Sequence, residues 1–164
     1  MATLGVKGFE LTEFGESDAG WVFSYKEDAS ATFEKKAPVV LEDGSGQLKI
    51  AVETAGFLGL SLEAKSGVEN TDRLVLVVNP NMIFSVSVSN GGAAQATALS
   101  QVGRRYGYKL SSVTGSTTIT TVDVADTTND NWEVIGLDPR DAVGDINGRV
   151  LVRAVPAKLI AVGA

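Results

Sequence analysis

The stretch QLKIAVETAGFLGLSLEAK, residues 47–65, alternates between apolar and polar side chains along most of its length. Leu48 and Ile50 are separated by a lysine, and leucines occupy every second position from Leu58 to Leu62. A period of two places apolar side chains on one face of a half-buried β-strand, and an α-helix does not produce it. The stretch therefore predicts two strands, joined as a hairpin by the Thr-Ala-Gly at 54–56.

Short apolar or β-branched segments of the same kind recur along the chain, separated by turn residues about every 8 to 12 positions. The other predicted strands lie near 21–25, 31–35, 73–78, 82–90, 117–124, 132–137, 148–155 and 157–164. The Ala-rich segment 91–103 is the only candidate for a helix. Roughly ten to twelve short strands predict an all-β fold, an antiparallel β-barrel or β-sandwich.

The organisation of the chain is predicted from where this pattern begins. Residues 1–18 show neither a clean helical nor a clean strand period, and we expect an extended N-terminal arm there. Residues 19–164 are expected to form a single β domain. No internal repeat is clear enough in the sequence to use.

The composition limits the chemistry that the chain can perform. Among 164 residues there is no Cys and no His, which excludes thiolate and Ser-His-Asp catalysis and zinc sites built on those residues. An enzyme would have to use carboxylates, Lys, Tyr or a metal held by oxygen ligands. We therefore predict a protein that is not an enzyme and that holds no cofactor.

The net charge and the length of the apolar runs limit the kinds of partner that the chain is expected to bind. The net charge is −6 and the first arginine is Arg73, so no basic surface for nucleic acid is expected. Arg104 and Arg105, beside Tyr106 and Tyr108, form the one basic-aromatic cluster, which we interpret as a strand end or an interface anchor. No apolar run approaches the roughly 20 residues of a membrane helix, and no secretory signal is visible, so no membrane partner is expected.

The acidic stretch DPRDAVGDINGRVLVRAV, residues 138–155, raises the question of a metal site. Aligned as an EF-hand loop, it places Val143 at the first ligand position and Ala154 at the twelfth, so two ligands fail. A looser cation site, which a metal-assisted hydrolase could use, remains as an alternative. Its ligands would be Asp138, Asp141, Asp145 and Asn147.

The preferred interpretation of this stretch is the connection of a β-hairpin. Gly144 can adopt a positive φ, and Asn147-Gly148 is a tight-turn pair. The segments 132–137 and 149–155 would be the two strands of that hairpin. The acids would then be structural, and no metal is expected.

From Asn79 onward, the order of features resembles the small virion proteins of tailed phages that decorate and stabilise the head. The resemblance joins an Asn-Pro turn before a strand, a Gly-centred segment, a Thr-rich segment, and a strand with a Pro-Asp loop before a final V-x-V strand. These segments are NPNMIFSVSVSNGG (79–92), ALSQVGRRYGYKL (98–110), GSTTITTVDVADTT (115–128) and WEVIGLDPRDAVGDINGRVLVRAV (132–155). It does not extend to residues 1–78.

The resemblance implies a capsid decoration, or cement, protein. Its partners would be the major capsid protein and further copies of itself, with a trimer favoured. It would be made in the host bacterial cytoplasm and reside on the capsid surface. Phe9, Phe14 and Trp21 are candidate anchors to coat protein or to a neighbouring copy, and burial in the protein's own core is the alternative for each.

Two other functions stay open from the sequence. One is a different virion component, such as a tail-tube or fibre-associated module. The other is a carbohydrate-binding β-sandwich, which would need exposed aromatic side chains on one sheet face. The chain has two Trp and three Tyr, spread along its length, which gives little support to a carbohydrate-binding module.

Overall fold

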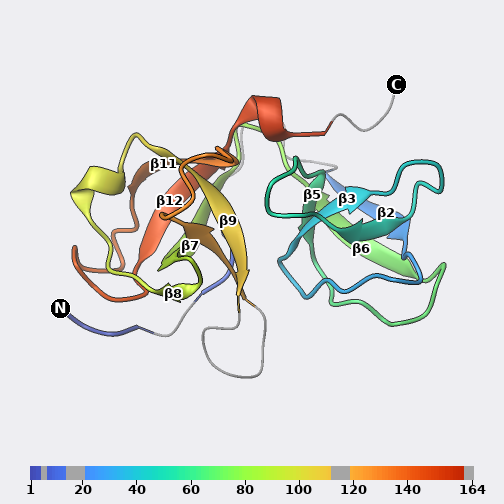
Figure 1. Ribbon diagram of the computed structural model, residues 1–164, viewed down its shortest axis with the longest axis horizontal. Coiled ribbons are helices and arrows are strands. Elements are labelled where there is room, and N and C mark those ends of the chain that lie inside the picture. Colours follow the sequence, from blue (N-terminus) through green and yellow to red (C-terminus); the bar gives the residue numbers. More distant parts are fainter. Residues whose placement is uncertain (5–6, 14–20, 112–118, 161–164) are drawn as a thin grey trace.

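The computed structural model describes residues 1–4, 7–13, 21–111 and 119–160 (Figure 1). Within these ranges the chain forms twelve β-strands and two short 3₁₀ turns, Leu99–Gln101 and Pro156–Lys158. The predicted all-β class is therefore confirmed. The Ala-rich helical candidate contains only the first of these turns and the two-residue strand β8 (Ala93–Ala94).

The C-terminal part of the chain closes into a five-stranded barrel. The strands follow one another in the ring β7-β10-β9-β11-β12, and β12 pairs with β7 again. All neighbours are antiparallel except β10 and β7, which are parallel. The strands are β7 (Ile83–Asn90), β9 (Arg105–Ser111), β10 (Ile119–Asp123), β11 (Trp132–Leu137) and β12 (Arg149–Ala154).

Strand β1 (Glu10–Glu13), from the predicted N-terminal arm, adds to this barrel. It pairs with the first half of β7, opposite Ile83 to Ser85, while the second half of β7 pairs with β10. The extra strand therefore occupies the place where β7 and β10 separate.

The preceding part of the chain forms a second five-stranded sheet, the N-terminal sheet, beside the barrel (Figure 1). Its order is β2-β6-β5-β3-β4, and a parallel bridge between Glu27 and Leu48 brings its two ends together. The strands are β2 (Val22–Lys26), β3 (Pro38–Leu41), β4 (Leu48–Ile50), β5 (Gly59–Ser61) and β6 (Asp72–Val77).

The predicted hairpin within residues 47–65 is wrong, although both of its strands form. β4 and β5 lie on opposite sides of β3 and do not pair with each other. The connection at 51–58 is longer than a usual hairpin loop, and it lets the chain cross the end of β3. The alternation of side chains predicts strands, but it carries no information about their neighbours.

The N-terminal sheet and the C-terminal barrel repeat one topology. β2, β3, β4, β5 and β6 have the same neighbours and directions as β7, β9, β10, β11 and β12, including the single parallel closure. The register also agrees. The pairs Phe23–Val75, Val39–Gly59 and Glu27–Leu48 correspond to Phe84–Val152, Tyr106–Trp132 and Val88–Val122.

Turns and hydrogen bonds outside the ladders match as well. Three positive-φ positions of the N-terminal sheet have counterparts in the barrel. They are Lys36 (φ 69), Gly67 (φ 79) and Asn70 (φ 62), which correspond to Gly103 (φ 79), Gly144 (φ 90) and Asn147 (φ 58). The chain therefore contains an internal structural repeat. The sequence did not reveal it, because the two halves share a backbone arrangement but few residue types at equivalent positions.

The apolar core has two parts. The larger cluster fills the barrel and continues between the barrel and the N-terminal sheet, where Leu60 and Leu76 contribute. A smaller cluster lies inside the N-terminal sheet, around Phe33, Val39 and Val75. β6 serves both clusters, with Val75 on one face and Leu76 on the other, as expected from its apolar side chains on both faces.

No helix in the described ranges is long and apolar enough to cross a lipid bilayer.

Candidate functional site

The acidic loop connects β11 to β12, as the sequence predicted. The two strands pair antiparallel from Trp132–Ala154 to Leu137–Val150, and residues 138–148 join them. Gly144 and Asn147 have φ values of 90° and 58°, so the loop uses both of the predicted turn positions. The hairpin interpretation is confirmed.

Asp138 starts the loop with its side chain almost completely buried. It accepts hydrogen bonds from the Arg140 backbone N–H and Nε, each at 2.9 Å to Oδ1, and from the Ser85 hydroxyl. The Arg140 guanidinium holds the pKa of the Asp138 carboxyl well below its usual range, although burial acts in the opposite direction. Asp138 is therefore a charged anchor between the loop and β7.

Asp141 forms a second ion pair across the base of the loop. The Arg149 guanidinium binds it through two nitrogens, with Nε–Oδ2 at 2.8 Å and Nη2–Oδ1 at 2.6 Å, and the Arg149 backbone N–H adds a bond of 2.8 Å. Hydrogen bonding from Arg149 lowers the pKa of Asp141 against the opposing effect of burial. This bidentate geometry leaves Asp141 committed to Arg149.

Asp145 and Asn147 fasten the N-terminal residues to the loop. Asp145 Oδ1 accepts the Ala2 N–H at 2.7 Å and Oδ2 accepts the Ala142 N–H at 3.0 Å. The Asn147 Nδ2 donates to the Leu4 carbonyl at 3.0 Å. Both Asp145 oxygens therefore accept backbone N–H groups, and the Asn147 amide is used to hold the Leu4 carbonyl.

The alternative cation site is not assembled. Its two arginine-bound carboxylates are neutralised within the chain, and the other two side chains bind the backbone. Among the described residues, no three acidic side chains gather into a group that could hold a metal ion. Arg140 and Arg149, which lie in the same stretch of sequence, decide this outcome by supplying the positive charge.

The candidate anchors have different places. Phe9 is 2% exposed, its ring lies 4.5 Å from that of Trp132, and it meets Phe84 edge-on at 6.1 Å. It belongs to the barrel core, so its ring is not free to anchor a partner. Trp21 is half-buried and packs against the same core, and Phe14 lies outside the described residues.

The basic-aromatic cluster is a strand end. Arg104 and Arg105 are exposed at the start of β9, while Tyr106 and Tyr108 are buried in the barrel. The Tyr108 hydroxyl donates to the Val52 carbonyl at 2.8 Å, and burial raises its pKa. Neither ring is available to stack on a base.

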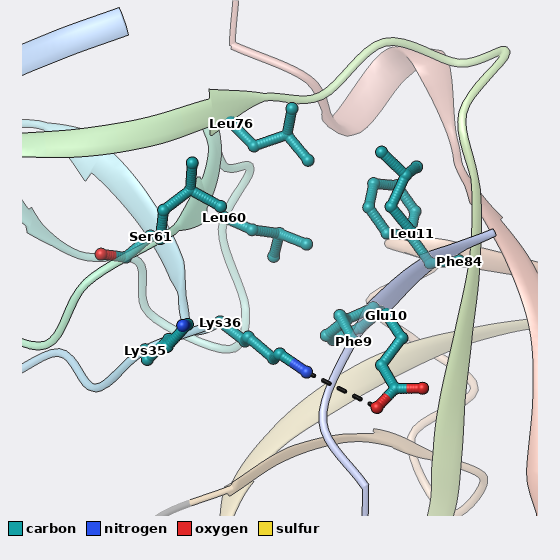
Figure 2. Close-up of a pocket in the computed structure, with 10 residues that line it drawn as sticks. Phe9, Glu10, Leu11, Lys35, Lys36, Leu60, Ser61, Leu76 and Phe84 are labelled. Carbon is teal, nitrogen blue, oxygen red and sulfur yellow. Dashed lines mark ion pairs between the residues drawn. The ribbon is translucent and has the colours of Figure 1, made fainter. Parts of the chain in front are cut away.

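A small apolar pocket of about 240 Å³ lies between β1 and the N-terminal sheet (Figure 2). Leucine and phenylalanine side chains from β1, β5, β6, β7 and the residues next to them make most of its lining. Its rim carries one long ion pair, Lys36 Nζ to Glu10 Oε1 at 3.7 Å. The volume is below the roughly 300 Å³ at which small-molecule sites begin, and few polar groups converge on it.

Sequence reasoning missed a surface at the edge of the N-terminal sheet. Val22 and Phe23 of β2 are 49% and 48% exposed, and Leu74 of the neighbouring β6 is 43% exposed. β2 pairs with β6 on one side; on its other side the bridge from Glu27 to Leu48 of β4 closes the end of the strand, and no described strand pairs with Val22–Lys26 there. The signal in the sequence was the pair Val22-Phe23, because consecutive apolar residues place apolar side chains on both faces of a strand.

Comparison of the chain with protein-family models, with curated proteins and with solved structures gives no match.

Proposed function

We propose that this protein is a capsid decoration protein of a tailed phage, which binds the outer surface of the major capsid protein lattice and stabilises the head. The observation that carries the proposal is the saturation of the acidic loop. Asp138 and Asp141 are bound by arginines, and Asp145 and Asn147 bind the N-terminal backbone. A loop with this geometry serves rigidity, which suits a passive binding protein.

Two further features support the proposal. The chain has no Cys or His, and both halves of the fold are small barrels or near-barrels with internally paired charges. A protein present in many copies on a lattice gains its hold from multivalency, so each copy needs only a modest contact surface. The resemblance of the segments after Asn79 to decoration proteins points to the same role.

The first test is the copy number of this chain in gradient-purified phage particles from its source, measured by quantitative mass spectrometry. We expect hundreds of copies, in a simple ratio to the major capsid protein. A few to a few dozen copies would contradict lattice decoration and favour a tail or fibre component. Absence from the particles would discard the virion role altogether.

A second test adds the purified chain to shells assembled from the major capsid protein alone. Saturable binding at a fixed ratio to coat subunits, with a higher temperature of shell disruption, is the expected result. The heat-denatured chain is the control, since it keeps the composition and loses the surface. Binding without any ratio to the coat subunits would contradict the proposal.

A further inference from the structure

The internal repeat shows what the edge of β2 lacks. β7 occupies in the barrel the place that β2 occupies in the N-terminal sheet, and Phe84 corresponds to Phe23. Phe84 is 1% exposed and Phe23 is 48% exposed. The phenylalanine at this register position is therefore buried in the barrel and half-exposed in the N-terminal sheet.

The cover over Phe84 is a strand. Leu11 of β1 lies opposite Phe84 in the ladder, and the ring of Phe9 meets Phe84 edge-on. Beside β2, no described strand takes the place that β1 takes beside β7. In Figure 1, β2 lies on the side of the N-terminal sheet that faces away from the barrel.

The backbone of β2 is oriented to accept such a strand. The Glu27 N–H donates toward β6, to Thr71 at 2.9 Å, as the equivalent Val88 N–H donates to Gly148 at 3.2 Å. The next amide back in the barrel, Ser87, points the other way and donates to Lys7, in the segment leading to β1, at 3.0 Å. Because amides alternate along a strand, the N–H groups of Ser24 and Lys26 face the open edge of β2.

We propose that β2 of a second copy of this chain occupies this edge, antiparallel and across a two-fold axis at Ser24. In that register Ser24 lies opposite Ser24 of the second copy, and Phe23 lies opposite Tyr25. Val22 lies opposite Lys26, whose charge is already paired with Asp72 at 2.9 Å. The register opposes no like charges, and it joins aromatic side chains at a closely spaced pair.

The choice of a second copy rests on this self-complementarity. An isologous contact needs one patch that matches itself, and a short strand with a central serine and an aromatic residue on each side meets that condition. The exposed Val22 and Leu74 of the two copies would lie on one face of the joined sheets, and the two Phe23 rings would lie on the other. The two-fold pairing differs from the trimer that the resemblance to decoration proteins implies.

Light scattering of the purified chain during gel filtration is the test, with charge variants at the axis. We expect a mass of twice 17.1 kDa for the unaltered chain. Ser24→Arg and Ser24→Glu would each weaken the dimer at least about tenfold, because like charges then face each other. An equimolar mixture of the two variants would restore it. Ser100→Arg, an exposed serine of the barrel, is the matched control and should leave the dimer intact.

A single-cysteine variant tests the register independently. The chain has no cysteine, so Ser24→Cys introduces one thiol, which would oxidise to a covalent dimer because opposed residues in this pairing have Cα atoms about 5.5 Å apart. Ser100→Cys should stay monomeric under the same oxidation in denaturing gels. A monomeric or trimeric unaltered chain, a dimer indifferent to Ser24→Arg, or a Ser24→Cys dimer that does not cross-link would overturn the proposal. None of these outcomes depends on a role in a phage particle.

Discussion

The N-terminal sheet and the C-terminal barrel share one strand arrangement and fill it in opposite ways. Gly59 and Trp132 stand at the same register position, opposite Val39 and Tyr106. The smallest residue therefore occupies in one half the place of the largest in the other. The barrel is packed with several aromatic rings, whereas the smaller core of the N-terminal sheet has, among the described residues, Phe33 as its one fully buried ring, together with alanine, valine and leucine side chains.

The two halves also differ in whether their interiors hold charged side chains. Where the barrel buries Val88 and Val150, the N-terminal sheet has Glu27 and Arg73, which form an ion pair at 2.9 Å. Burial acts to raise the pKa of Glu27, but hydrogen bonds from Ser66, Arg73 and Gly67 outweigh it and hold the pKa below its usual value. This backbone arrangement therefore tolerates either apolar side chains or a fully paired ion pair at the same interior positions.

The outer faces of the two sheets also differ in polarity, and this difference determines which surfaces of the two halves pack together. Leu60 and Leu76 of the N-terminal sheet pack toward the barrel and are buried. The equivalent residues of the barrel, Glu133 and Arg153, form an ion pair at 3.1 Å on its surface. The two halves therefore meet through unlike surfaces, and the contact is not a symmetric one.

The largest expected effect is the difference in stability between losing a buried phenylalanine of the barrel and losing a half-exposed one of the N-terminal sheet. Phe9→Ala should lower the free energy of unfolding by about 4 kcal/mol, because a ring packed on Trp132 is lost from the barrel core. Phe23→Ala, in which the removed ring is half exposed, should cost less than about 1.5 kcal/mol at concentrations where the chain is monomeric. Urea unfolding of both variants measures the difference. Equal losses would mean that Phe9 is not part of the core.

The next effect concerns the charged interior of the N-terminal sheet. Glu27→Val should cost about 3 kcal/mol, because it leaves Arg73 buried without its closest partner. Adding Arg73→Val reproduces the valines of the barrel and should recover at least about 1 kcal/mol of that loss. A double-mutant cycle by urea unfolding gives the coupling. If the two losses simply add, the ion pair does not substitute for an apolar contact in this fold.

Acid should weaken both halves of the fold, and one buried carboxylate in each contributes to that loss. Glu27 and Asp138 have lowered pKa values in the folded chain, so they stabilise it above their unfolded pKa near 4 and lose that contribution as the pH falls through the folded value. Between about pH 5 and pH 2, we expect Asp138→Asn to remove about 2 kcal/mol of the fall in stability. Unfolding curves at several pH values measure it. The same slope in the variant and the unaltered chain would contradict the role of Asp138.

The smallest effect tests the shared turn conformation. Lys36 (φ 69) stands where the barrel has Gly103 (φ 79), and a non-glycine residue pays about 1 kcal/mol or more for that conformation. Lys36→Gly should therefore stabilise the chain by about 0.5 kcal/mol after the added freedom of the unfolded glycine is subtracted. Gly103→Lys should destabilise it by about 1 kcal/mol, since only the backbone opposes the side chain there. Thermal unfolding of the pair measures both signs, and two changes of the same sign would contradict the equivalence.

The all-β class, most strands and the acidic hairpin could be predicted from the sequence because each depends on local information. A period of two identifies a strand, and glycine or asparagine at a turn identifies a positive φ, whatever lies nearby. Gly144 and Asn147 are examples that the structure bears out. The absence of Cys and His limited the available chemistry in the same direct way.

Contacts between distant segments were decided only in three dimensions. The sequence offered four polar ligands in the acidic loop, and the ion pairs with Arg140 and Arg149 turned two of them into anchors. From the sequence, Phe9 was either an anchor to a partner or a core residue, and the fold places it against Trp132, more than a hundred residues away.

Alternation along a strand determines which side chains share a face, but strand order depends on which apolar faces find each other when the chain collapses. For this reason the sequence by itself determined the all-β class, most of the strands, the turn of the acidic hairpin and the chemistry that the missing Cys and His exclude. It placed a strand at 31–35 that does not form, and it missed β3. The tertiary structure decided the placement of β3 between β4 and β5, the repeat of one topology in two halves, and the open edge of β2. These follow from hydrogen bonds and packing between residues far apart in the chain, and no local pattern records them.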